Sequence, residues 1–179
     1  MPSQAHVALA DRLKDVDDLL GAHGAVTAAH AANPGRRFNV MGINRGAILL
    51  LSAHLEGYIE DLMEECLRHV NPSLSGEALR RGFMNPTADR IDEFFALIGL
   101  KKPTKNATIS WQNCDNARVR ASLKQLIETR NKIAHGTQET VHKGTVELLH
   151  RHVKAFAVRF DEVVARHMTT ILGGTRPWP

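Results

Sequence analysis

Apolar residues recur along most of the chain at intervals of three and four positions, the spacing that places side chains on one face of a helix. The longest such pattern covers residues 43–70, and Asn71-Pro72 ends it because the residue before a proline is disfavoured in a helix. Its apolar positions are Ile48, Leu51, Leu55, Ile59, Leu62 and Cys66. Further apolar residues widen this face, so we expect a central helix that contacts several neighbours.

Other segments carry the same helical pattern. Residues 3–32 begin at Ser3, a capping residue, and end before the Asn-Pro-Gly sequence at 33–35. A helix is expected within residues 87–100, with Thr87 as its cap. Two more are expected at about 116–135 and 145–171.

No segment shows the alternation of apolar and polar residues that predicts a strand. Aromatic residues make up only 5% of the chain, which also favours helices over a sheet sandwich. The sequence therefore predicts an all-α fold, an up-down bundle of four to five main helices. We expect one domain over residues 1–172 and a flexible tail over 173–179, which has no periodic pattern.

The charge balance permits an anionic partner. The net charge is +4 with histidine neutral, and protonation of some of the ten histidines would increase the positive potential. Arg36, Arg37, Arg80, Arg81, Lys101 and Lys102 form basic clusters, which are usually solvated loops but would contact the backbone of a bound RNA. Few aromatic residues lie among them, so base stacking there is not expected.

The sequence points to a protein of the reducing cytoplasm. The first 20 residues have neither the basic nor the apolar region of a signal peptide, and no apolar run is long enough for a membrane span. Cys66 and Cys114 form no CxxC motif, so neither a disulfide framework nor a zinc site is predicted, and Cys66 is expected in the core. No phosphate-binding or dinucleotide motif occurs, so we expect no cofactor and no metal.

The most informative segment is "RNKIAHG", residues 130–136. On a helix, Asn131 and His135 lie four positions apart and therefore share a face. Arg130 falls near the apolar stripe, where a buried cation needs an anionic partner, a wet cleft or a second subunit. Helix termination accounts for His135 and for Gly136 as the left-handed residue after the helix, but not for Arg130.

These side chains suit phosphate chemistry. Arginine offers a planar fork of donors to phosphate oxygens, histidine titrates near neutrality, and asparagine donates to phosphate or orients an imidazole. His150 and His152 are a weaker candidate for a metal pair, because they are two positions apart and point to different faces of a helix. We expect these two histidines to be solvated.

The motif Arg130-Asn131-x-x-x-His135 resembles the signature of the HEPN superfamily. The upstream segment "INRGAILLLSAHLEGYIEDL" is similar to the helix that precedes the motif in the RiboL-PSP-HEPN branch, and the helical layout matches over residues 5–170. The resemblance implies a homodimer formed through the motif-bearing helix, with two motifs in one cleft. It also implies that Glu56 and Tyr58 match polar positions on the upstream helix.

The resemblance also implies metal-independent endoribonuclease activity, which many HEPN members have, often in toxin–antitoxin or antiviral systems. The implied partners are therefore RNA and an antitoxin or defence protein. RNA carries its own nucleophile, the 2′-hydroxyl, and two histidines and two arginines from a symmetric pair would supply base, acid and charge stabilisation. Adenylylating relatives have a tyrosine two residues before the histidine, and Ile133 occupies that position here.

Two alternatives remain open from the sequence. One is a non-catalytic HEPN module that binds a nucleotide or partners a separate effector. The other is a plain helical dimer in which Arg130 pairs with a carboxylate such as Glu56. Whether Arg130 and His135 open to a cleft or are sealed by a salt bridge separates these interpretations.

Overall fold

The computed structural model describes residues 1–29, 40–71 and 83–178, and these fold into helices. Its helices are α1 (Gln4–Arg12), α2 (Lys14–Ala29), α3 (Val40–Val70), α5 (Ala88–Ala96), η1 (Pro103–Lys105), α6 (Asn116–Ala134) and α7 (Lys143–Ile171). Within these ranges no strand forms. The predicted all-α, up-down bundle is confirmed.

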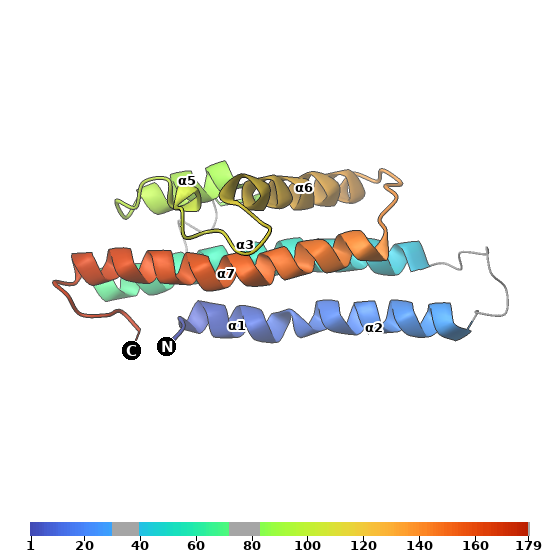
Figure 1. Cartoon of the computed structure of the whole chain (residues 1–179), viewed down its shortest axis with the longest axis horizontal. Coiled ribbons are helices and arrows are strands. Elements are labelled where there is room, and N and C mark those ends of the chain that lie inside the picture. The colour runs from blue at the N-terminus through green and yellow to red at the C-terminus, as the bar shows by residue number, and fades with distance from the viewer. Residues whose placement is uncertain (30–39, 72–82, 179) are drawn as a thin grey trace.

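The helices form three layers (Figure 1). α3 and α7 lie side by side in the middle layer. α1 and α2 follow one another along one side of this pair, and α5 and α6 cover the opposite side. α3 therefore has neighbours on both sides, which agrees with the wide apolar face expected for residues 43–70. None of the described helices is both long and apolar enough to cross a membrane.

The first predicted helix is split in two. Ser3 caps α1 by accepting a hydrogen bond from the His6 amide at 3.0 Å, as expected. The helix then ends at Leu13, a buried residue that separates α1 from α2. α2 ends at Ala29, and residues 30–32 of the predicted helix lie outside the described part of the chain.

Aromatic side chains fill the core between α3 and α7. Tyr58, Phe156 and Phe160 are fully buried there, and Phe95 of α5 packs edge-to-face on Phe160 with 5.0 Å between the ring centroids. A buried aromatic pair of this kind contributes about 1 kcal/mol beyond the area that it buries. This contact attaches the α5–α6 layer to the central pair.

His150 and His152 are buried, contrary to the expectation of solvated side chains. The reason is that α7 is a central helix with neighbours on both sides. His150 faces α2, where its Nδ1 lies 3.5 Å from the Asp17 carboxylate. His152 faces α6, where its Nδ1 lies 2.6 Å from the Ser122 hydroxyl oxygen.

Residues 173–178 of the expected flexible tail make specific contacts. Arg176 forms an ion pair with Glu162 at 2.9 Å, and Trp178 is only 4% exposed, with its ring 6.2 Å from that of His69. Periodicity does not detect a single buried aromatic residue, so this packing could not be predicted from the pattern.

Both cysteines are free and buried. Cys66 lies in the α3 core, as predicted, where burial raises the pKa of its thiol. Cys114 lies in the outer layer, immediately before α6, and forms a small backbone bridge with Trp111.

Candidate functional site

Arg130 and Asn131 lie near the C-terminal end of α6, and both are partly buried. One guanidinium nitrogen of Arg130 donates to the side-chain oxygen of Asn131 at 2.9 Å and to that of Asn85 at 3.3 Å. No carboxylate within the described ranges forms an ion pair with Arg130. Its guanidinium is therefore oriented by two neutral carboxamides, and no anion of the described residues neutralises it.

His135 is the residue at which α6 ends, and its side chain is exposed. Its backbone amide still donates to the Asn131 carbonyl at 3.0 Å, so the two residues share one face of the last turn. Gly136 then takes a positive φ of 79°, which confirms the predicted left-handed residue. The amides of Gly136 and Thr137 close the helix end by bonding to Ile133 and Lys132.

The segment after His135 is attached to the start of α3. The Arg45 side chain donates to the Glu139 carbonyl at 2.8 Å, and the Asn44 side chain donates to the Val141 carbonyl at 2.7 Å. Lys132 adds an ion pair with the Glu139 side chain at 3.4 Å. These contacts fix where α6 stops, and so where His135 is presented.

Glu56 lies close to the motif but does not pair with Arg130. Its carboxylate accepts a hydrogen bond from the Asn85 amide at 3.4 Å, and the Asn85 side chain in turn contacts Arg130. The structure therefore contains no Arg130–Glu56 salt bridge, which was the contact proposed in the plain-dimer interpretation.

Tyr58 does not reach the motif. It is fully buried, its hydroxyl donates to the Ala157 carbonyl at 3.1 Å, and burial raises its pKa well above the ordinary value. Glu56 and Tyr58 are two positions apart on α3, so they point to roughly opposite sides of the helix. The resemblance matches both residues to polar positions of the upstream helix, as candidate supporting residues, and the geometry brings only Glu56 near the motif.

Asn85 is the site residue that the sequence analysis missed. It lies in the segment before α5 and takes a positive φ of 58°, which asparagine tolerates better than most residues. The sequence signal was the pair Asn85-Pro86 immediately before the helix cap Thr87, a pattern that marks a turn. Nothing in that pattern indicates that the turn contacts a residue near the end of α6.

A groove of about 520 Å³ lies between the start of α5 and α6. Asn85 and Asn131, the two residues that hold Arg130, both line it. The charged side chains along it include Asp89 and Arg90 on α5 and Lys124 on α6. The groove therefore begins beside the Arg130 contact and runs along the outer face of α6.

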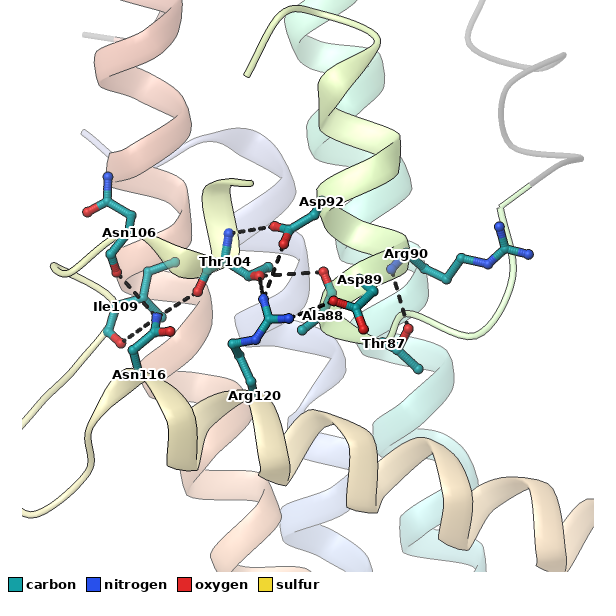
Figure 2. A network of polar contacts seen from close by, with 10 residues as sticks. All are labelled: Thr87, Ala88, Asp89, Arg90, Asp92, Thr104, Asn106, Ile109, Asn116 and Arg120. Atoms are coloured by element: carbon teal, nitrogen blue, oxygen red, sulfur yellow. Dashed lines mark hydrogen bonds and ion pairs between the residues drawn. The ribbon is translucent and has the colours of Figure 1, made fainter. Parts of the chain in front are cut away.

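Arg120 joins the walls of this groove. Figure 2 shows its side chain reaching from α6 to α5 and η1. It donates to the carboxylates of Asp89 at 2.6 Å and Asp92 at 3.1 Å, and also to the Thr104 hydroxyl. Asp92 is only 8% exposed and accepts a further bond from the Thr104 amide at 2.8 Å. This buried network sets the spacing between α5 and α6.

Of the six predicted basic residues, the structure describes Lys101 and Lys102, and these two lie away from the motif. Lys101 and Lys102 are exposed beyond the C-terminal end of α5, whereas Asn85 precedes its N-terminal end. Arg36, Arg37, Arg80 and Arg81 lie outside the described residues. Among the described side chains, no group of three or more His, Cys, Asp or Glu is arranged to hold a metal ion.

Comparison with known proteins identifies the family. No curated protein and no solved structure matches the chain. The family model for RiboL-PSP-HEPN matches residues 8–166, which span α1 to α7 and include Arg130, Asn131 and His135. The chain therefore belongs to the RiboL-PSP-HEPN family.

Proposed function

We propose that this protein is a metal-independent endoribonuclease that cleaves single-stranded or looped RNA through attack by the 2′-hydroxyl. The observation that carries the proposal is the state of Arg130. Its guanidinium is partly buried, oriented by Asn85 and Asn131, and has no carboxylate partner among the described residues. A cation that is oriented but not neutralised suits a phosphate group, which arginine binds through its planar fork.

Each motif residue has a role in this reaction. His135 of one subunit removes the proton of the 2′-hydroxyl, whose oxygen then attacks the adjacent phosphorus. Arg130 stabilises the negative charge that develops on the phosphate oxygens. His135 of a second copy protonates the departing 5′-oxygen, and Asn131 holds the guanidinium in place. The products are a 2′,3′-cyclic phosphate and a 5′-hydroxyl end.

The scheme requires a homodimer, because each chain supplies one His135 and the reaction uses a base and an acid together. Two α6 ends related by a two-fold axis form one composite cleft in this proposal. Exposure of His135 at the end of α6 supports it, since the imidazole is available to a second copy. A toxin–antitoxin or antiviral system is the cellular setting that we propose.

The test is cleavage of a labelled single-stranded RNA by the purified protein. We expect cyclic-phosphate products, activity that survives EDTA, and no cleavage of DNA of the same sequence, which lacks the nucleophile. Arg130→Ala and His135→Ala should each lower the rate by roughly 100-fold or more. Activity that needs added magnesium would refute the mechanism. RNA or nucleotide binding without cleavage by the wild type would favour the non-catalytic module instead.

A further inference from the structure

The α5–α6 groove has a regular wall on the α6 side. Ala121, Lys124, Glu128 and Asn131 follow one another at spacings of three, four and three residues, so they form one stripe along the helix. Its last member, Asn131, belongs to the motif and contacts Arg130. A ligand that lies along this stripe therefore ends beside the Arg130 guanidinium.

The opposite wall reaches the same point. It comprises the first turn of α5 and, before it, Asn85, whose side-chain oxygen also contacts Arg130. Two carboxamide groups thus stand where the groove meets the proposed reaction centre. Carboxamides pair with the donor and acceptor edges of nucleobases, adenine above all.

The charged side chains that line the groove are paired with one another or with a neighbour. Asp89 and Glu128 line it together with Arg90, Arg120 and Lys124, and Arg120 lies 2.6 Å from Asp89. Lys124 lies 3.7 Å from Glu128, and Arg90 lies 3.0 Å from Glu93, so these cations are already paired. Ala88, Ala121 and Ile127 add apolar surface. A flat base with polar edges suits this mixture better than a polyanionic backbone does.

We propose that the groove seats the unpaired nucleobase of the nucleotide next to the scissile phosphate. This inference rests on the proposed endoribonuclease function and names the part of the substrate that the site reads. A volume of about 520 Å³ lies in the usual range of small-ligand sites and accommodates a nucleotide. Single-stranded and looped RNA present unpaired bases that can enter such a groove.

The Arg120 network keeps the groove open in the absence of RNA. Arg120 holds α5 through Asp89 and Asp92, and the Asn116 side chain donates to the Thr104 carbonyl at 2.6 Å (Figure 2). A groove whose walls are fixed in advance loses little conformational entropy when a ligand enters.

The test is a substitution that fills the groove and leaves the residues of the motif unchanged. Ala121 is exposed on the α6 stripe, and Ala117 is exposed one turn earlier, outside the groove lining. We expect Ala121→Trp to raise KM for single-stranded RNA about tenfold and to weaken the base preference beside the cut in a randomised RNA pool. Ala117→Trp should behave as wild type. Circular dichroism checks folding, and the smaller Ala121→Gln serves if the tryptophan variant is unfolded.

Two results would overturn the inference: wild-type KM and base preference in Ala121→Trp, or a fall in kcat alone. A 2′-O-methyl RNA cannot be cut, so its binding tests the groove independently of the proposed nuclease activity. If Arg130→Ala retains cleavage, the nuclease mechanism fails. Weaker binding of the 2′-O-methyl RNA by Ala121→Trp than by Ala117→Trp still supports the groove, and equal binding still rejects it.

Discussion

The side-chain oxygen of Asn85 accepts a hydrogen bond from the Arg130 guanidinium at 3.3 Å, although the two residues are 45 positions apart in the sequence. The backbone amide of Asn85 in turn donates a hydrogen bond to the Glu56 carboxylate of α3. Arg130 is thus oriented through a residue of a turn, and not through a direct contact with a carboxylate. This arrangement assigns Asn85 a positioning role in the proposed reaction.

Asn85→Gly should slow RNA cleavage by roughly 10-fold or more, because it removes the oxygen that orients Arg130 while glycine keeps the positive φ. We expect kcat to fall and KM to rise, because Asn85 also lines the groove proposed for the base, with little change in the melting temperature. Asn113→Gly is the matched control, since Asn113 also has a positive φ, of 63°, and lies outside the groove lining. Wild-type kcat in Asn85→Gly would remove Asn85 from the mechanism.

A mixed dimer tests whether the two subunits share one cleft. We expect a dimer with one wild-type chain and one His135→Ala chain to have far less than half of the wild-type rate, because base and acid come from different chains. Two independent sites would give about half, by counting intact sites. Rates measured on affinity-purified mixed dimers distinguish these outcomes, and half activity would reject the composite cleft while leaving the role of His135 intact.

Arg120→Met should destabilise the fold by about 2–4 kcal/mol, because it leaves the nearly buried Asp92 carboxylate without its ionic partner. Urea unfolding measures this loss. Arg90→Met is the control. Its pair with Glu93 has both side chains more than 60% exposed, and such surface pairs contribute less than about 1 kcal/mol. Similar losses in the two variants would show that the Arg120 network does not hold α5 to α6.

Stability should fall as the pH drops below the ordinary histidine pKa of 6.5. Burial, aided by the charges of Arg118 and Arg151, lowers the pKa of His152. Between the lowered and the ordinary pKa the unfolded chain binds more protons than the folded chain, so acidification favours unfolding. The stabilisation is complete above pH 6.5 and is lost below it.

His152→Asn should reduce this pH dependence, since asparagine can still hydrogen bond to Ser122 but does not titrate. Melting temperatures at about pH 7.5 and pH 5.5 give the comparison with wild type. Burial also lowers the pKa of His150, so some dependence should remain. An unchanged difference between the two pH values would contradict the assignment to His152.

Features that depend on a single helix could be predicted from the sequence. Periodicity located α3, α6 and α7, the cap residues Ser3 and Thr87 were identified correctly, and Gly136 takes the expected left-handed conformation. These features depend on residues that are close in sequence, so a local pattern contains the necessary information.

Features that depend on contacts between the helix layers could not be predicted from local sequence patterns. The burial of His150 and His152 follows from α7 having neighbours on both sides. Asn85 joins the site only because the segment before α5 meets the end of α6. The proposed roles of Arg130, Asn131 and His135 came from the motif and remain to be tested by the experiments above.

The two free cysteines are buried in different layers of the bundle, one in the central layer and one beside α6. Their reactivity therefore reports which layer has opened. Cys66 is fully buried in the core on α3, so a thiol reagent reaches it only when the core around α3 opens. Cys114 precedes α6, so detachment of the α5–α6 layer alone would expose it. Labelling rates of the two thiols in the wild-type chain therefore distinguish partial from global opening without any introduced cysteine.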